Sequence, residues 1–269
     1  MDVYRMNRIK RTLAVLLVAT LAASPTLVLA QMGAPKEKSE VAKRIEAALA
    51  SDIRTAEERA RDKPERKPVE TLEFFGLQPN MTVVELLPGA GWYTKILGQV
   101  LADNGKLILA VGADRLAPKL KEWKLDKVEV PTIKADFKPS GQYGVSSIET
   151  LEIPVQNADM VLTFRNEHNL TPESRARLHA AVLGMLKPGG IYGVVDHTGR
   201  HMAPGTRETW RRLDPVVVIQ EITAAGFEFV GFSDLHYRPD DELRYDTERP
   251  SIAHYSDRFT LKFRKPLAK

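Results

Sequence analysis

The sequence contains no cysteine among its 269 residues. This absence excludes disulfide bonds, thiolate ligands for a metal and a cysteine nucleophile. It also excludes attachment to a membrane through a lipid-modified cysteine. Stability must therefore come from packing, and a chain of this length with 43% hydrophobic residues can bury one large core.

The chain also lacks a strong excess of charge of either sign. It has 39 basic and 35 acidic residues, but residues 1–30 hold four of the basic residues and one of the acidic ones. The remainder carries a net charge of +1, which gives no broad basic surface for a phosphate backbone. We therefore predict no nucleic-acid partner, and no feature of the sequence predicts an oligomeric state.

The first 30 residues resemble an export signal. A basic stretch, RMNRIKR, precedes the apolar stretch TLAVLLVATLAASPTLVLA, and small residues stand just before Gln31. This order predicts a signal peptide that is cleaved after Ala30, a periplasmic or secreted protein and no stable membrane association after cleavage. A retained membrane anchor is the alternative, although Ser24 and Pro25 leave an apolar run shorter than the roughly 20 residues of a membrane span.

Two regions follow the leader. Residues 31–67 are charged and alanine-rich, with apolar residues at helical spacing, and predict an N-terminal helical extension packed loosely on the main domain. From residue 68 to residue 269, strands and helices alternate. Strands are expected at 81–87, 106–112, 127–136, 158–164, 191–197, 228–235 and 258–266, and helices at 68–76, 92–103, 114–123, 171–190 and 214–227.

Alternating strands and helices predict an α/β domain with a mostly parallel sheet and helices on both faces. The last two strands have no helix between them, so we expect them to pair as an antiparallel edge. In such a sheet a ligand binds at the carboxyl ends of the strands, where the strand order reverses.

The stretch VVELLPGAGWYT, residues 83–94, leads from a buried strand through a glycine turn into a helix. Gly89 and Gly91 allow the backbone to approach a ligand, and the helix amides after them favour a polar group. A dinucleotide fingerprint requires a third glycine where this chain has Thr94, so a pyrophosphate is disfavoured. A tight turn without any ligand is the alternative.

Two acidic residues end the next two expected strands. Asp114 is placed to accept the hydroxyls of a ribose, and Asp136 is placed to reach an adenine amino group. Either side chain could instead be a solvated loop acid.

These features together resemble the class I S-adenosylmethionine-dependent methyltransferases. The resemblance rests on Glu85 with the Gly89 and Gly91 turn, on Asp114 and Asp136, and on LKPGG at residues 186–190. Several stretches resemble still more closely a group of predicted, uncharacterised and often exported bacterial methyltransferases: ETLEFFGLQPNMTVVELLPGAGWYT, TFRNEHN and DRFTLKFRKP.

The resemblance implies a Rossmann-like class I methyltransferase fold, with a seven-stranded, mostly parallel sheet and an antiparallel last strand. It also implies S-adenosylmethionine as the cofactor, bound along Glu85, Pro88, Gly89, Gly91, Asp114 and Asp136. One position departs from the family pattern, because Leu87 stands where the loop usually has its first glycine. Its Cβ would narrow the pocket at the methionine end.

A polar cluster, TFRNEHNLTP at residues 163–172, follows the fourth expected strand. In the resembled fold this loop faces the transferred methyl group and the acceptor. His168 is a candidate general base, Arg165 a candidate partner for an acceptor carboxylate or phosphate, and Asn166 a further catalytic candidate. The alternative is structural: Asn166 and Asn169 would cap the turn, and His168 would bond a buried carbonyl.

The fifth expected strand ends in Asp196 and His197, near the same cleft. Asp196 either orients a histidine or caps the next loop. A metal site formed by Asp196, His168, His197 and His201 is an alternative, but no spacing here is typical of metal ligands, and we assign none.

Three functions remain open at this stage, of which one is a metal- or acid-base-assisted enzyme built on His168, Asp196 and His197. The resemblance implies methyl transfer from S-adenosylmethionine to a small-molecule acceptor. Another alternative is an exported, non-catalytic ligand-binding protein with a methyltransferase-like fold. Leu87 favours this alternative, as does export from the cytoplasm, where the cofactor is made.

Overall fold

The computed structural model describes residues 37–267. The predicted leader, residues 1–30, and its cleavage site lie outside the described residues. The chain divides into two units at Glu37 and Lys38, and every element described below belongs to the second unit, residues 38–269. No helix within residues 37–267 is both long enough and apolar enough to cross a membrane.

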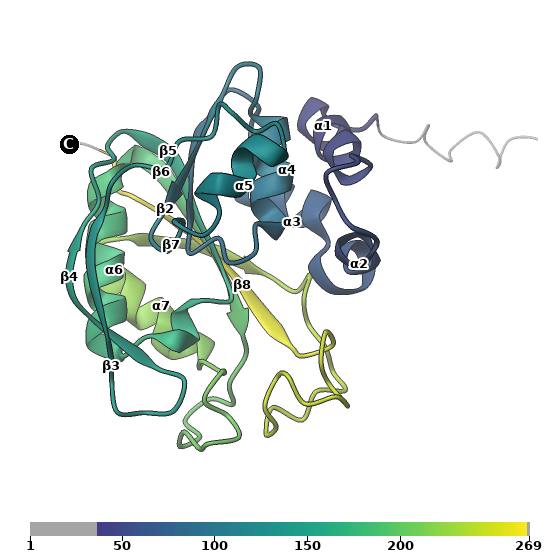
Figure 1. The fold of residues 1–269 in the computed structure, drawn as a ribbon. Helices are drawn as coiled ribbons and strands as arrows, with labels where there is room; N and C mark the ends of the chain where they lie inside the picture. Colours follow the sequence, from purple (N-terminus) through teal and green to yellow (C-terminus); the bar gives the residue numbers. More distant parts are fainter. Residues whose placement is uncertain (1–36, 268–269) are drawn as a thin grey trace, which may run out of the picture. The chain divides into compact units, whose positions relative to one another are not determined.

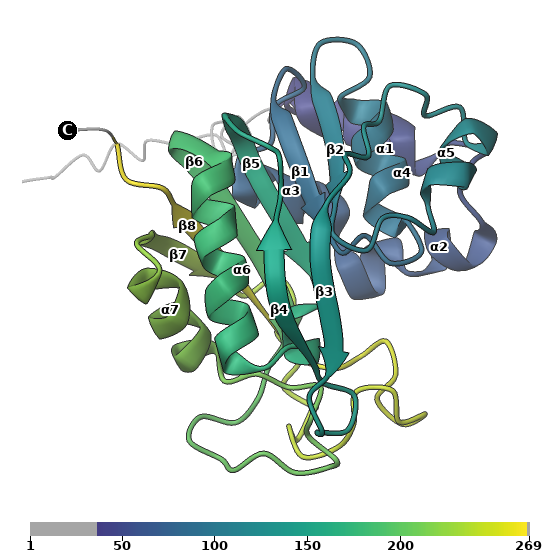
Figure 2. The ribbon, with the colours of Figure 1, turned by 60° about the vertical axis from the view of Figure 1, so that its left-hand side comes forward.

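The centre of this unit is a six-stranded sheet with the strand order β2-β1-β5-β6-β8-β7 (Figures 1 and 2; β1 is labelled in Figure 2). Its strands are β1 (Thr82–Leu86), β2 (Lys106–Ala110), β5 (Ala158–Phe164), β6 (Leu186–His197), β7 (Glu228–Ser233) and β8 (Arg258–Arg264). The four adjacent strands β2, β1, β5 and β6 run parallel, and β8 runs antiparallel to both β6 and β7. The predicted α/β class, the mostly parallel sheet and the antiparallel pairing of the last two strands are confirmed.

The prediction of a seven-stranded sheet is wrong by one strand. Within the expected strand 127–136, only Glu129 pairs with β2, through hydrogen bonds with Leu107 and Leu109. Pro131 follows and has no amide hydrogen to continue the ladder. The chain instead enters β3 (Lys134–Pro139), which forms a separate antiparallel pair with β4 (Ser146–Glu152), a strand that the sequence did not predict.

Helices cover both faces of the sheet (Figures 1 and 2). On one face, α1 (Glu40–Leu49), α3 (Pro68–Phe75), α4 (Trp92–Val100) and α5 (Ala117–Glu122) pack their apolar side chains into one core cluster. On the other face, α6 (Pro172–Met185) and α7 (Pro215–Ala224) share a second cluster with β4. Helix α6 ends before the LKPGG stretch, which begins β6 rather than ending the helix as predicted, because Pro188 cannot continue a helix.

The N-terminal segment packs more tightly than predicted. Ile45 of α1 is fully buried in the first core cluster. After α2 (Ala56–Ala60), a single π-helical turn, η3 (Asp62–Arg66), ends at Lys67, whose φ of 39° turns the chain into α3. Glu65 and Arg66 are both buried in this turn, so a segment outside the predicted domain contributes to its interior.

Strands β1, β2, β5, β6 and β7 all run in the same direction, so the chain leaves each of them at the same edge of the sheet. Five connections therefore meet at this edge. The two longest are residues 198–214, after β6, and residues 234–257, after β7. A buried ion pair joins them: both Nη atoms of Arg212 lie 2.9 Å from the Asp241 carboxylate. These connections frame the candidate site.

Candidate functional site

The glycine turn lines a cavity of about 240 Å³, called here the loop cavity. The backbone from β1 to α4 is left-handed at Leu87, Gly89 and Gly91, with φ values of 49°, 58° and 83°. This shape turns the chain back toward the sheet edge and exposes the turn to the cavity. The lining residues are Glu58, Arg61, Arg66, Glu85–Ala90, Trp92, Tyr93, Phe164, Arg165 and Asn166.

The two predicted glycines have different surroundings. A Cβ on Gly89 would meet nothing within 4 Å, and Gly89, like Pro88 beside it, lines the loop cavity. A Cβ on Gly91 would lie 2.8 Å from two ring atoms of Trp123. Gly91 is therefore required by packing, whereas Gly89 leaves room for a ligand.

Replacing each glycine with alanine should separate these roles. We expect Gly91→Ala to lower the free energy of unfolding by about 2–3 kcal/mol, since it adds a clash to a left-handed residue. Gly89→Ala should cost only about 1 kcal/mol, from backbone strain alone. Chemical denaturation of both variants measures the difference, and equal losses would contradict the assignment.

Glu85 lies at the floor of the loop cavity. Its side chain is buried and accepts a hydrogen bond of 2.6 Å from the Thr94 hydroxyl. Burial raises the pKa of Glu85 to about 8, against the opposing effects of Thr94 and Arg66. Thr94, which occupies the position of the missing third glycine, thus holds this carboxyl group in place.

Asp114 lies in a different, smaller cavity of about 160 Å³, together with Gly112 and Phe137. The Leu87 side chain lines the loop cavity, and its Cδ2 lies 3.3 Å from where a Cβ on Gly112, which lines the Asp114 cavity, would be. The leucine noted in the sequence would therefore crowd a ligand that reaches from the glycine turn toward Asp114.

Asp136 is placed elsewhere. It lies on β3, exposed, and pairs with Lys138 at 3.2 Å. It lines neither the loop cavity nor the cavity of Asp114. The physical reason is the departure of the chain from the main sheet at Pro131, which moves the end of the expected third strand away from the sheet edge.

Half-buried and buried arginines gather around the carboxylate of Glu65. Arg61 binds both of its oxygens, and Arg258 donates to Oε1 at 2.9 Å. Arg165 Nη1 lies 3.6 Å from Oε1, and His254 Nδ1 lies 3.2 Å from Oε2. Burial alone would raise the pKa of Glu65, but the hydrogen bonds from Arg61 and the charges of Arg258, Arg66 and Arg61 lower it to about 2.

The predicted catalytic histidine forms a dyad with Asp196. His168 Nδ1 lies 2.6 Å from Asp196 Oδ1, and both side chains are buried. The Asp196 carboxylate also accepts hydrogen bonds from the backbone amides of Glu167, His168 and His197. An acceptor surrounded by these donors favours the proton on Nδ1 and leaves the Nε2 lone pair of His168 available.

Two details of the structural alternative for this loop differ from the contacts in the structure. The Asn166 side chain makes no helix cap and donates instead to the Leu86 carbonyl and to Thr163. His168 bonds a carboxylate rather than a carbonyl. Arg165 has a φ of 62° and lines the loop cavity together with Asn166.

The histidines near Asp196 have separate partners. His197 Nδ1 lies 2.9 Å from the Ser256 hydroxyl, and burial lowers the pKa of His197 well below its usual range, so that its ring stays neutral. His201 is exposed and pairs with Asp214. Within residues 37–267, no three acidic or histidine side chains are grouped to hold a metal ion.

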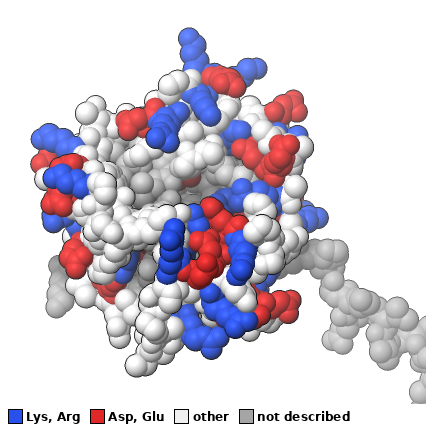
Figure 3. All heavy atoms as spheres, turned by 60° about the horizontal axis from the view of Figure 1, so that its bottom comes forward, with Lys and Arg blue, Asp and Glu red and all other residues white. Residues whose placement is uncertain are grey.

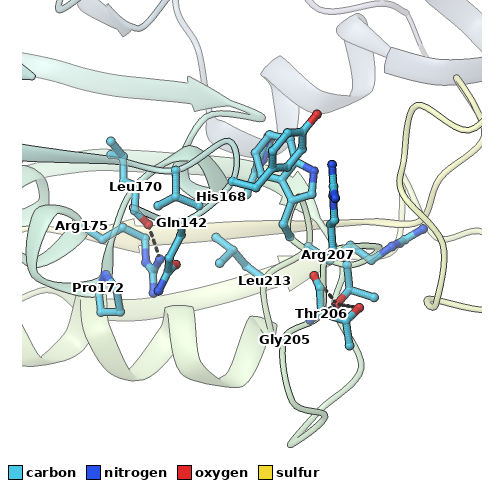
Figure 4. Close-up of a pocket in the computed structure, with 14 residues that line it drawn as sticks. Gln142, His168, Leu170, Pro172, Arg175, Gly205, Thr206, Arg207 and Leu213 are labelled. Atoms are coloured by element: carbon cyan, nitrogen blue, oxygen red, sulfur yellow. Dashed lines mark hydrogen bonds between the residues drawn. The ribbon is translucent and has the colours of Figure 1, made fainter. Parts of the chain in front are cut away.

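Two larger cavities meet at His168. The first, of about 860 Å³, is drawn in Figure 4 and lies between α6 and the connection 198–214; its walls include Leu170, Pro172 and Leu213. The second, of about 600 Å³, is called here the basic cavity. Figure 3 shows the face that carries these connections, with Lys and Arg side chains beside a hollow. The residues that line the basic cavity are Arg61, Arg165, His168, Asn169, His197, Trp210, Arg211, Thr247, Glu248, Ala253, His254 and Arg258.

The three cavities are joined by shared side chains. Arg61 and Arg165 line both the loop cavity and the basic cavity. His168 and Trp210 line both the basic cavity and the larger one, with ring centroids 6.0 Å apart. A group bound at the glycine turn would therefore lie next to the space in front of His168.

Sequence reasoning missed Arg61, Glu65, Arg66, Trp210 and Arg258. The first three stand in the segment interpreted as a helical extension, and its many charges gave no reason to single them out. Arg258 begins β8, where the sequence signalled only a strand. The proline at position 64, inside a run of charged residues, is the one local sign of an irregular turn.

Comparison with known proteins gives relatives of low identity. No family model matches the chain. A ubiquinone/menaquinone biosynthesis C-methyltransferase UbiE from Hydrogenovibrio crunogenus is 25% identical over 203 residues, covering 71% of this chain and 66% of that protein. The protein of the same name from Shewanella halifaxensis is 28% identical over 120 residues, which is 45% of this chain and 44% of that protein. The match thus spans about two thirds or less of each relative.

Solved structures agree on the fold. A SAM-dependent methyltransferase from Aquifex aeolicus superposes with a TM-score of 0.51 at 16% identity, covering 84% of this chain and 99% of that one. The [4+2]-cyclase SpnF superposes with a TM-score of 0.54 at 17% identity, covering 82% of this chain and 85% of that one. Together with the observed strand order, these likenesses show that the chain has the Rossmann-like α/β fold of the class I methyltransferases.

Proposed function

We propose that this protein transfers a methyl group from S-adenosylmethionine to a small-molecule acceptor. The observation that carries the proposal is the loop cavity at the end of β1, which shares Arg61 and Arg165 with the space in front of the His168–Asp196 dyad. The two UbiE relatives support the reaction class, and the fold supports the place of the cofactor.

The residues present fit this cofactor. Arg61, Arg66 and Arg165 offer cationic partners to its carboxylate, and Gly89 leaves open space beside the turn. Asp114 is exposed and makes no hydrogen bond or ion pair with other residues in the range 37–267, so it is available to a ribose. Leu87 is the side chain that disfavours the cofactor, because it would crowd a molecule that reaches from the glycine turn to Asp114.

When bound, S-adenosylmethionine supplies an electrophilic methyl group. The chain's own residues supply position and proton transfer. Asp196 fixes the ring of His168, and Nε2 of that ring can accept a proton from an acceptor hydroxyl or amine in the adjoining cavity. Trp210 lies near His168, and its ring forms an apolar wall of this space.

The test is calorimetric titration of the purified protein with S-adenosylmethionine and its demethylated product. We expect micromolar binding that is lost in Asp114→Ala. Leu87→Gly should tighten binding about fivefold, because the cofactor no longer has to displace a side chain worth roughly 1 kcal/mol of strain.

Glu122→Gln, an exposed change on α5, is the matched control and should leave binding unaltered. Absence of binding by both wild type and Leu87→Gly at millimolar concentration would reject the methyltransferase proposal. It would favour the second candidate, a non-catalytic ligand-binding protein, for which the crowding by Leu87 is the specific observation.

We further propose that the chain is exported and that its leader is removed after Ala30. The motif that supports this is the basic and then apolar sequence of residues 5–30. N-terminal sequencing of the protein recovered from the periplasmic fraction should begin at Gln31. Recovery of an intact N-terminus from the cytoplasm would contradict export.

A further inference from the structure

We propose that the basic cavity binds an oxyanion group of the acceptor, a carboxylate or a phosphate monoester, and so presents the rest of that molecule to His168. The inference deepens the proposed methyl transfer and rests on it only in identifying the bound molecule as the methyl acceptor. The charges and the geometry of the cavity support the anion site independently.

The basic cavity is lined by an excess of positive charge, on arginines that are half-buried (Arg61, Arg165) or buried (Arg258). Arg61, Arg165 and Arg258 all line the basic cavity, and each has Glu65 as its only ion-pair partner within residues 37–267. One carboxylate cannot neutralise three guanidinium groups. Arg66, next to Glu65 in the chain, adds a fourth guanidinium that forms no ion pair in the same part of the structure.

One of these arginines, Arg258, also keeps an unused donor. Arg258 is 4% exposed, and its Nε is buried without a hydrogen-bond partner in the described part of the chain. Both oxygens of Glu65 already have two or more partners, so Glu65 cannot take up another donor. An incoming oxyanion would satisfy planar, forked donors that the protein leaves in excess.

Electrostatics agree with this geometry. Burial and the charge of Arg165 lower the pKa of Arg258 to about 10, although Glu65 opposes them. Burial likewise lowers the pKa of Arg165. A bound anion would relieve the cost of holding these charges together out of water.

The remaining charged side chains of the cavity do not cancel the excess. Glu248 and Arg211 pair with each other at 3.0 Å, and Arg211 also binds Asp246. His254 pairs with Glu65, and His197 is buried and neutral. The anion site is therefore the group of Arg61, Arg165 and Arg258.

The volume and the lining of the basic cavity suit a small molecule with an anionic group. Its volume of about 600 Å³ lies within the roughly 300–1,000 Å³ of small-molecule pockets. The arginines and His168 line the same space, with the Trp210 ring as an apolar wall. A small ring compound with an anionic substituent could thus contact the arginines at one end and His168 at the other.

The experiment is calorimetric titration of the full chain with benzoate, phenyl phosphate and the neutral isostere benzamide at fixed ionic strength. We expect benzoate or phenyl phosphate to bind with a dissociation constant of about 1 mM or lower, and benzamide to bind at least about tenfold more weakly. The preferred anion distinguishes a carboxylate site from a phosphate site. Equal binding of benzamide, or no binding of either anion, would overturn the proposal without relying on any variant.

Two variants localise the site. Arg165→Met should weaken anion binding about tenfold or more, and Arg258→Lys, which keeps the charge but removes the fork, should weaken it about fivefold. Arg258 lines the basic cavity but not the loop cavity, so its effect excludes binding at the glycine turn. Arg115→Met, an exposed change outside both cavities, is the control and should have no effect. Unchanged anion binding in both site variants would overturn the placement.

The outcome is separable from that of the proposed function. Anion binding with no binding of S-adenosylmethionine would reject methyl transfer and uphold the anion site. Cofactor binding with no anion binding would uphold methyl transfer and reject this inference.

Discussion

Replacing His168 with glutamine is expected to lower kcat for methyl transfer by about 10²- to 10⁴-fold. Glutamine can still donate a hydrogen bond to Asp196, which lies 2.6 Å from the histidine ring, so the buried carboxylate keeps a partner. Its amide nitrogen cannot accept a proton, however, and the acceptor would lose its general base. KM should change little, because His168 is only one of many side chains around the two cavities that it lines.

The measurement is transfer of a labelled methyl group from S-adenosylmethionine to a small-molecule extract of the source cells. Asp196→Asn should also lower kcat, because it alters the hydrogen bond that fixes the ring. His201→Gln is the control: His201 is exposed and pairs with Asp214, away from the dyad. If the His168 variant retained the wild-type kcat, catalysis would rest on positioning alone.

Replacing Glu167 with glutamine is expected to remove a pH-dependent loss of stability on the order of 4 kcal/mol. Glu167 is fully buried beside the dyad. Its Oε1 accepts a 2.6 Å hydrogen bond from the Tyr192 hydroxyl, while Oε2 has no partner within residues 37–267. Burial raises its pKa from an ordinary 4.5 to about 8, although the Tyr192 hydrogen bond opposes the shift.

The direction of this change in stability with pH follows from the pH at which each state releases the Glu167 proton. Above pH 4.5 the unfolded chain releases this proton, while the folded chain keeps it until about pH 8. The contribution of Glu167 to the free energy of unfolding is therefore full below pH 4.5 and is lost as the pH rises through 8. Glutamine has no proton to release, so the free energy of unfolding of the variant should rise steadily relative to that of wild type between pH 4.5 and pH 8.

Urea denaturation at pH 4.5, 6.5 and 8.5 measures the difference between the two proteins. Taking the difference cancels the similar contribution of Glu85, which both proteins retain. Glu122→Gln, an exposed change, should follow wild type at every pH. A constant difference between Glu167→Gln and wild type would show that Glu167 is ionised throughout and that the polar cluster is better solvated than its burial indicates.

The neighbourhood of Glu167 also ties the loop of the dyad to β6 through several hydrogen bonds. The backbone amides of Glu167 and His168 both donate to Asp196, and the Glu167 side chain is tied to Tyr192 on β6. His179 of α6 packs against the same tyrosine, and burial lowers the pKa of His179 to about 3, so it is neutral. The loop that carries His168 is thus fixed to β6 by groups that never reach either cavity.

Local patterns in the sequence determined most of the elements of the main sheet and their order along the chain, although not the separate strand β4. Apolar runs such as VVELL and KLILA, with a glycine turn or a proline at their ends, are sufficient to predict β1, β2 and the helices after them. Such patterns act over a few residues, and neighbouring side chains settle them. The dyad could be predicted in part for the same reason, since His168 follows one predicted strand of a parallel sheet and Asp196 lies at the end of another.

Only the tertiary structure decided which of these residues meet. Pro131 turns the chain out of the sheet and carries Asp136 away, although its place in the pattern looked equivalent to that of Asp114. Glu65 and Arg258 are 193 residues apart in sequence, yet they form a buried ion pair. The hydropathy of a segment carries no information about such a partner, because the energy of a buried charge depends on what the rest of the fold places beside it. The sequence alone therefore determined a strand, a turn and a helix at the glycine loop, while the basic cavity next to it arises only when the N-terminal segment packs against β8.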